Sequence, residues 1–231
     1  MKKFYKQVDV AAADGGWQVA LDGREIKTQH GRPQVTPTRA MAEALAAEWA
    51  DQGEEIDPAR FVMRDQTDYA IDVIALDAAA VIDKLLSYGD TDTLLYRAHP
   101  DEPLYQRQQQ EWEPLVCAFE EREGVRMNRI SGVMHRPQPE ESMARLRTRL
   151  TEQDAFTLAG LQVLTSLAAS LTIGLSALEA DGDVEQLWKL ANLEEEWQAE
   201  LWGRDEQAEA RSAKRRDAFI AAHRWLGLLR A

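Results

Sequence analysis

Four carboxylates have the residue types and the spacing to take part in chemistry. Asp90 and Asp92 lie two positions apart, and Glu194 and Glu195 adjoin each other within an apolar stretch. Two carboxylates can serve as general acid and general base when their surroundings separate their pKa values. One hypothesis is therefore an enzyme that uses Asp90, Asp92 and Glu195. It requires the three side chains to converge in one concave pocket, and no neighbouring residue in the sequence is identifiable as a substrate-orienting group.

The other common catalytic and ligand motifs are missing. The four histidines are scattered, with no helical pair at metal-ligand spacing, and no glycine-rich phosphate loop occurs. Asp90-Thr-Asp92 and Asp181-Gly-Asp183 each begin like a calcium loop, but neither has the glycine or the final glutamate at the required positions. Helix capping explains both segments better. We therefore expect no metal, no cofactor and no small-molecule substrate.

The glutamates at 194–196 belong to a segment that we expect to form one helix from about Asp183 to Leu201. At about 100° per residue this helix has two apolar faces. The first is formed by Leu187, Leu190, Leu193, Trp197 and Leu201. The second is formed by Val184, Trp188, Ala191, Ala199 and Trp202, with Glu195 among them.

A carboxylate within an apolar face is costly unless it is paired or hydrated. Glu194 and Glu195 therefore either reach solvent, pair with an arginine from a neighbouring helix, or mark a face left open for a partner. In the last case Glu195 would meet a positive group on that partner. Gly203 is expected to end the helix, because glycine adopts the left-handed conformation at low cost.

Composition limits the function further. The chain has 231 residues, 45% of them hydrophobic and 29% charged, as in globular proteins. Its net charge of −13 argues against a nucleic-acid partner and against binding to anionic membranes. Its single cysteine, Cys117, permits no intrachain disulfide. The first residues resemble neither a signal peptide nor a transit peptide, so we expect a cytoplasmic protein.

The segment Phe156–Leu178 carries no charge and is long enough to cross a bilayer. It also carries many Ser, Thr, Gly and Gln residues and has no strong basic flank, so a central buried helix is the better interpretation and no integral membrane segment is expected. A second amphipathic stretch follows Lys214-Arg-Arg216 near the end of the chain. It either packs on the body, which is our expectation, or docks on a partner or on a membrane surface.

Taken in order, the chain predicts an α+β fold. Phe4–Val10, Trp17–Leu21 and Glu25–Thr28 are expected as antiparallel strands, with Asp22-Gly23 as a hairpin turn. A helix over about 38–52 covers this sheet. Beyond Asp57-Pro58 nearly everything is helical, and the expected helices lie near 64–76, 78–88, 91–97, 103–122, 140–151, 154–180, 183–202 and 205–229.

Several segments, in the right order over nearly the whole chain, resemble the family of assembly chaperones for the alpha subunit of the F-type ATP synthase catalytic head. These segments are Phe4-Tyr-Lys6, Leu21-Asp-Gly-Arg24, Ala47-Glu-Trp49, Ala70-Ile-Asp72, Tyr88-Gly-Asp-Thr-Asp92, Leu95-Tyr-Arg97, Arg107-Gln108, Trp112, Pro114-Leu115, Gly132-Val-Met-His135, Gln138-Pro139 and the acidic–aromatic run 194–203. The resemblance implies a small α/β domain, which we place at 1–63, and a larger orthogonal helical bundle at 64–231.

The resemblance also implies a function without catalysis. The expected partner is the unassembled alpha subunit, held by the apolar surface that the beta subunit later covers, in the cytoplasm of a bacterium. We expect the client-binding residues to be Glu194, Glu195, Glu196, Trp188, Gln198 and Trp202. The signature residues expected to be structural are Trp49, Asp90, Asp92, Arg97 and Trp112. For Trp49 the simplest role is core packing; for Asp90, Asp92 and Arg97 it is capping and an internal ion pair.

Overall fold

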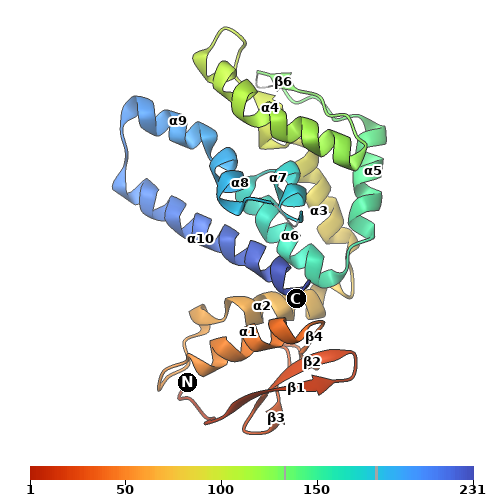
Figure 1. Cartoon of the computed structure of the whole chain (residues 1–231), viewed down its shortest axis with the longest axis vertical. Coiled ribbons are helices and arrows are strands. Elements are labelled where there is room, and N and C mark those ends of the chain that lie inside the picture. The colour runs from red at the N-terminus through yellow and green to blue at the C-terminus, as the bar shows by residue number, and fades with distance from the viewer. Residues whose placement is uncertain (133, 180–181) are drawn as a thin grey trace. The chain divides into compact units, whose positions relative to one another are not determined.

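The computed structural model (Figure 1) describes residues 1–132, 134–179 and 182–231. The chain divides into two compact units. Unit 1 consists of Met1–Ala78, Asp154–Gly160 and Arg224–Ala231, and unit 2 consists of Ala79–Gln153 and Leu161–His223. The sheet and its covering helix lie in unit 1, and most of the helices lie in unit 2, which confirms the expected α+β class.

The sheet of unit 1 is built around one central strand. Its strands are β1 (Val8–Ala13), β2 (Gly16–Leu21), β3 (Arg24–Glu25) and β4 (Val35–Thr36). β2 pairs antiparallel with β1 along one edge, and with β3 and β4 along the other. Asp22 and Gly23 both have positive φ angles, of 48° and 77°, as the predicted Asp-Gly turn requires. The first strand begins at Val8 rather than at Phe4.

Two helical segments complete the core of unit 1. α1 (Arg39–Ala50) begins at the cap Thr38, whose hydroxyl accepts from Met41 N at 3.2 Å, and it buries Met41, Leu45 and Trp49 against the sheet. α2 (Val62–Tyr69) continues into a π-helical turn over Ala70–Ile74.

The described residues of unit 2 form mainly helices and their connections, together with one short β ladder. Its helices are α3 (Ala79–Asp90), α4 (Pro103–Glu123), α5 (Glu140–Thr151), α7 (Leu171–Ser176), α8 (Val184–Ala191) and α9 (Leu193–Trp202). α6 (Ala155–Ala168) and α10 (Glu206–Leu228) contribute residues to both units. The helix expected over 91–97 is wrong: a 3-10 turn at Thr93–Leu95 leads into β5 (Tyr96–Arg97), which pairs parallel with β6 (Ile130–Ser131).

The uncharged segment is buried, as expected, but it forms two helices rather than one. α6 ends at Ala168, Ala169 has a φ of 48°, and the Ser170 side chain caps α7 by accepting from Ile173 N. In the part of the chain that the structure describes, no helix is both long enough and apolar enough to cross a membrane.

The first segment of unit 1 runs on to Ala78, beyond the position 63/64, and unit 1 also takes in two distant parts of the chain. Trp225 is fully buried, stacks on Phe156 with ring centroids 6.0 Å apart, and donates from Nε1 to Phe156 O at 3.0 Å. The Thr38 hydroxyl donates to Leu228 O at 2.6 Å. These contacts join the chain end to unit 1, and they account for the apolar residues of the tail by packing.

Candidate functional site

The segment expected as one helix over 183–202 is broken at Asn192. This residue leaves helical geometry (φ −110°, ψ 18°), and its side-chain nitrogen donates back to Trp188 O at 2.8 Å. The side-chain bond closes the end of α8, and α9 begins at the next residue. The single-helix prediction is therefore wrong, and a helical wheel drawn through 184–202 joins residues that do not share a face.

The two tryptophans expected on one face have opposite surroundings. Trp188 is 5% exposed and packs on Phe219 of α10, with ring centroids 5.4 Å apart. Trp202, at the end of α9, is 77% exposed, and its neighbour Leu201 is 57% exposed. Trp188 is thus part of the core of unit 2, and the expected shared Trp188/Trp202 surface does not form.

Glu194 and Glu195 point to different partners. Glu194 is half-buried, and its Oε1 accepts from Gln108 Nε2 of α4 at 2.6 Å. Burial raises the pKa of Glu194, and the Gln108 hydrogen bond only partly offsets this effect. The Glu195 side chain is 58% exposed and accepts from Arg215 Nη1 of α10 at 3.1 Å. Glu195 therefore both reaches solvent and pairs with an arginine from a neighbouring helix, which are two of the three expectations for it.

Further ion pairs hold the outer part of α9. Glu196 pairs with Arg204 at 2.8 Å, and Arg204 also pairs with Glu209 of α10 at 3.0 Å. Glu200 pairs with Arg107 of α4 at 2.6 Å, and this bond is the main reason why the pKa of Glu200 is lowered. Together with Gln108, Arg107 attaches α9 to α4 near both of its ends.

α9 and α10 enclose a groove of about 620 Å³. Figure 1 shows the two helices side by side, joined by the turn that follows Trp202. Four of the six expected client-binding residues line the groove, namely Glu195, Glu196, Gln198 and Trp202. Ala199 and Ala208 contribute small apolar surface, and Arg204, Arg211 and Arg215 contribute positive charge. The groove thus presents an exposed indole between charges of both signs, as protein-docking surfaces commonly do.

Four of the five expected structural residues, Asp90, Asp92, Arg97 and Trp112, lie in unit 2, and Trp49 lies in unit 1. Asp92 is fully buried, and its two carboxylate oxygens accept from Leu94 N at 3.0 Å and Thr172 N at 2.8 Å. Arg97 donates from Nη1 to Gln108 O at 2.8 Å and pairs from Nη2 with Glu113 at 3.1 Å.

The remaining signature residues also make internal contacts. Trp112 Nε1 donates to Leu190 O at 2.8 Å. Asp90 Oδ1 accepts from Gln138 N at 2.9 Å. Trp49, in unit 1, is 8% exposed and packs on Phe61, with ring centroids 4.5 Å apart. Val133, within the segment 132–135, lies outside the described residues.

The carboxylates required by the enzyme hypothesis do not converge. The α9–α10 groove contains Glu195 but neither Asp90 nor Asp92, and both Asp92 oxygens are occupied by backbone amides. Among the described residues, no group of three or more His, Cys, Asp or Glu side chains is placed to hold a metal ion. The geometry therefore gives no support to an enzyme built on these three residues.

Sequence reasoning missed the basic side of this site. Arg107 and Gln108 were recognised only as a motif, and Arg215 only as part of a basic run. A signal for Arg215 is present in the sequence. It lies on an amphipathic helix that follows the glutamates closely in the chain, and opposite charges on neighbouring helices commonly pair. The sequence could not show which turn of that helix faces α9.

The fold of this chain is a small antiparallel sheet with a covering helix followed by a mainly helical body, and its α9–α10 groove carries an exposed tryptophan among charged side chains. The model of the family described as ATP12 chaperone protein matches residues 2–120 of the chain. The chain belongs to this family, which consists of ATP synthase assembly chaperones.

Solved structures of relatives are similar over nearly the whole chain. Atp12 from Paracoccus denitrificans is 35% identical, with a TM-score of 0.93, covering 99% of this chain and 98% of that one. A mutant of the same Paracoccus protein gives the same identity and TM-score. The Atu1473 protein, a putative chaperone from Agrobacterium tumefaciens, is 37% identical, with a TM-score of 0.91, over 99% of this chain and 85% of that one. The mitochondrial protein atp12 of Schizosaccharomyces pombe is 25% identical over 90% of this chain and 75% of its own length.

Proposed function

We propose that this chain is a holdase that binds the unassembled alpha subunit of the ATP synthase catalytic head and prevents its aggregation until the beta subunit docks. The observation that carries the proposal is the 77% exposure of Trp202 beside the α9–α10 groove. Leaving an indole in water is costly, whereas burying it in an interface is among the most favourable single contacts. An exposed tryptophan beside a groove is typical of a surface that a protein partner covers in the complex and leaves open when it dissociates.

The physical need for such a protein follows from the architecture of a ring of subunits. A subunit without its neighbour exposes the apolar interface that the neighbour would bury, and such surfaces aggregate. A chaperone has to cover this surface reversibly and bind it more weakly than the true neighbour does, so that assembly displaces the chaperone. No catalysis, nucleotide or metal enters this scheme, and we propose that the chain works without them, in the bacterial cytoplasm.

Within the site we assign separate roles to the residues. Trp202 supplies the apolar contact, and Gln198 and Glu196 lie beside it in the groove. Glu195 supplies the electrostatic contact: its pair with Arg215 is exposed, so a cation on the client can replace the arginine at small cost. Glu194 and Trp188 act through position, because one attaches α9 to α4 and the other packs against α10.

The test is an aggregation assay with purified components. Alpha subunit diluted from denaturant is followed by light scattering, alone and with the chain at equal concentration; serum albumin serves as the control. We expect the chain to suppress scattering and the later addition of beta subunit to release it in free form. Scattering that is unchanged relative to albumin contradicts the proposal. Equal suppression for any aggregating protein would contradict its specificity for the alpha subunit.

A further inference from the structure

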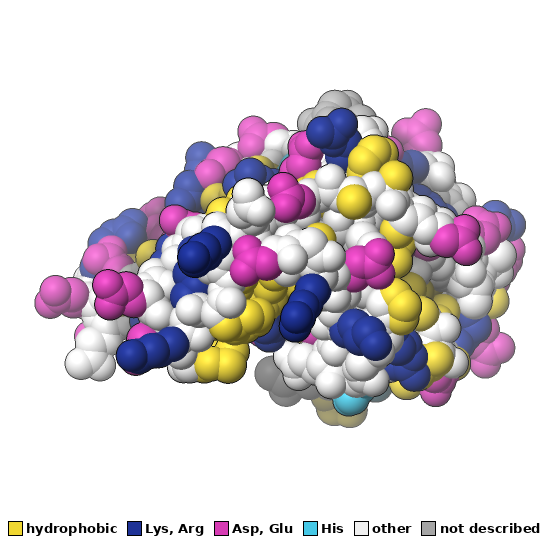
Figure 2. Space-filling view, turned by 90° about the horizontal axis from the view of Figure 1, so that it is seen from below, with side chains coloured by type: hydrophobic (Ala, Val, Ile, Leu, Met, Phe, Trp, Pro, Cys, Tyr) yellow, Lys and Arg dark blue, Asp and Glu magenta, His cyan; other side chains and the backbone are white. Residues whose placement is uncertain are grey.

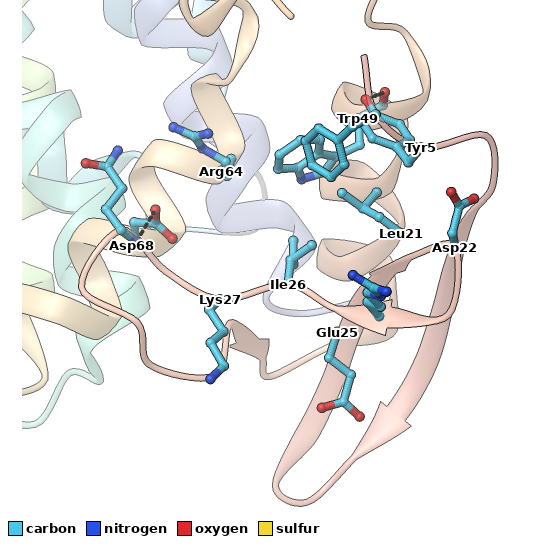
Figure 3. Close-up of a pocket in the computed structure, with 12 residues that line it drawn as sticks. Tyr5, Leu21, Asp22, Glu25, Ile26, Lys27, Trp49, Arg64 and Asp68 are labelled. Atoms are coloured by element: carbon cyan, nitrogen blue, oxygen red, sulfur yellow. Dashed lines mark hydrogen bonds between the residues drawn. The ribbon is translucent and has the colours of Figure 1, made fainter. Parts of the chain in front are cut away.

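Unit 1 contains a second cavity, of about 660 Å³, that the proposed function does not use. Figure 3 shows it between the segment preceding β1, the β2–β3 turn, the loop after β3, and helices α1 and α2. A volume of this size is within the range of pockets that bind small ligands and short peptide segments.

The inner wall of this pocket is apolar and rigid. Tyr5, Leu21 and Trp49 line it and are each less than one-tenth exposed, and Ile26 adds a half-buried aliphatic surface. The Trp49 ring is held in place by an edge-to-face contact with Tyr5, at 5.6 Å between centroids. Phe4 also lines the pocket and is 62% exposed, so the apolar surface continues outward. A large apolar side chain could therefore enter without rearrangement of the core.

The pocket wall also carries an unused hydrogen-bond donor. Trp49 is 8% exposed, its indole Nε1 is buried, and this nitrogen has no hydrogen-bond partner. Figure 3 shows the indole nitrogen on the side of the ring that faces Ile26. A buried donor without an acceptor costs about 1–3 kcal/mol, and such groups are rare in folded proteins. An acceptor on a bound molecule would remove this cost.

The charged side chains around the pocket differ in whether they already have hydrogen-bond partners. Asp22 accepts from Lys6 N at 3.0 Å and from Gln7 N at 2.8 Å. Asp68 accepts from the side chain of Gln34 and from Gln29 N.

The other charged residues at the rim remain available. Figure 3 shows the ends of the Glu25 and Lys27 side chains both directed away from the apolar wall of the pocket. Arg24 and Lys27 line the pocket, and within the described ranges neither forms an ion pair. Figure 2, which views the molecule from below relative to Figure 1, shows an apolar patch near the middle of the visible face, with Lys or Arg side chains on either side and Asp or Glu side chains close to it. Two rim cations, Arg24 and Lys27, and one rim anion, Glu25, are thus without an ion pair among the described residues, so the unpaired rim charge is +1, although the whole chain carries a net charge of −13.

We propose that this pocket binds an extended polypeptide segment in which a large apolar side chain stands next to an acidic one. The apolar side chain fills the space between Tyr5, Leu21 and Ile26. A main-chain carbonyl of the segment accepts from Trp49 Nε1, and the acidic side chain pairs with Arg24 or Lys27. This site lies in unit 1 and does not depend on the α9–α10 groove or on the alpha subunit as client.

The test uses the full chain and the blocked dipeptide acetyl-Phe-Glu-amide as probe. The indole N–H resonances of the seven tryptophans are recorded during titration, and Trp49 is assigned by its loss in Trp49→Phe. We expect the Trp49 resonance to shift in a saturable manner. Acetyl-Phe-Lys-amide should bind about fivefold more weakly, as expected for one exposed charge pair. A Trp49 resonance that does not move, or equal binding of the two dipeptides, overturns the proposal.

Substitutions in the pocket test the charged contact and the hydrogen bond from Trp49 separately. The double change Arg24→Ala with Lys27→Ala should abolish the preference for the acidic dipeptide, whereas Arg39→Ala, which removes an exposed cation of α1 outside the pocket, should preserve it. Trp49→Phe keeps a ring and removes the donor; binding followed through the Ile26 methyl resonance should weaken about tenfold while the chain remains folded, as its thermal unfolding transition shows. The proposal fails if Arg39→Ala has the same effect as the double variant, or if Trp49→Phe binds as tightly as the unaltered chain.

Discussion

Gln108 Nε2 donates to Glu194 Oε1 at 2.6 Å, and this bond joins α4 to the first turn of α9. The neighbouring Arg107 pairs with Glu200 two turns further along α9. Two adjacent residues of α4 therefore hold α9 near both of its ends. The helix is fixed by these polar contacts, so its last turn can leave Trp202 in solvent.

The Glu194 carboxyl gives a pH dependence with a definite sign. Its pKa in the folded chain lies above the usual value of 4.5, because burial disfavours the charged form. The folded state therefore binds this proton more tightly than the unfolded state, and the free energy of unfolding falls as the pH rises from the usual value through the raised one. Glu194→Gln removes the charge and keeps an acceptor for Gln108. We expect a higher urea midpoint than that of the unaltered chain at pH 7, with the advantage vanishing as the pH falls below 4.5. A variant that is less stable at pH 7, or whose advantage does not vary with pH, contradicts this.

Substitutions at Trp188 and Trp202 should distinguish an effect on the stability of the fold from an effect on binding of the alpha subunit. Trp188→Ala empties a buried site against Phe219 and should lower the free energy of unfolding by about 3–5 kcal/mol. Trp202→Ala removes an exposed ring and should change it by less than about 0.5 kcal/mol. Chemical denaturation measures both changes, and the aggregation assay should show that Trp202→Ala nevertheless loses most of its protection of the alpha subunit. Full protection by a correctly folded Trp202→Ala would exclude the ring as a contact.

Glu195→Lys reverses the charge that we assign to the electrostatic contact. The lost pair with Arg215 is exposed, so the free energy of unfolding should fall by no more than about 1 kcal/mol. Affinity for the alpha subunit should fall at least about tenfold, because a lysine would repel the client's cation. Glu43→Lys is the matched control: Glu43 is exposed to a similar extent and also pairs with an arginine, Arg39, but lies on α1 of unit 1. Equal losses of affinity in the two variants would point to net charge rather than to the groove.

We expect Asp92 to contribute to the stability of the fold and not to contact a client. Asp92→Ala leaves the buried amides of Leu94 and Thr172 without their acceptors, which should cost roughly 2–6 kcal/mol at about 1–3 kcal/mol for each group. Urea unfolding gives the value. A loss below about 1 kcal/mol would mean that the two amides find other acceptors.

Local sequence signals predicted the elements whose ends are set locally. The Asp22-Gly23 turn, the Thr38 cap of α1 and the limits of α5 follow from residues within one turn of each boundary. The two helix breaks carry only the cap residues Ser170 and Asn192, with no glycine or proline at the break. At Ala169 the chain adopts a left-handed conformation that alanine disfavours, and Thr93, far away in sequence, donates both its backbone N–H and its hydroxyl to Ala169 O at 3.1 and 2.9 Å. Asn192 ends α8 through its own side chain, where a glycine or proline would have been the usual sign.

The features of the site that depend on neighbouring residues in the sequence were predictable, and those that depend on contacts between distant parts of the chain were not. The unusual position of the glutamates in an apolar segment was evident from the sequence, and pairing with an arginine was one of the stated outcomes. The contrast between Trp188 and Trp202 was not evident, because it depends on the break at Asn192 and on the packing of Phe219 from α10. A helical wheel assumes one continuous helix axis, whereas Trp188 and Trp202 lie on two different helices, α8 and α9.

Hydrogen exchange on the complex with the alpha subunit tests the central claim most directly. Backbone amide exchange of the full chain is measured by mass spectrometry with and without purified alpha subunit. Binding at the groove predicts slower exchange in α9 and the first half of α10, with peptides covering Trp202 and Arg215 showing the largest change. A complex that forms while exchange in these two segments stays the same would show that the alpha subunit is held elsewhere.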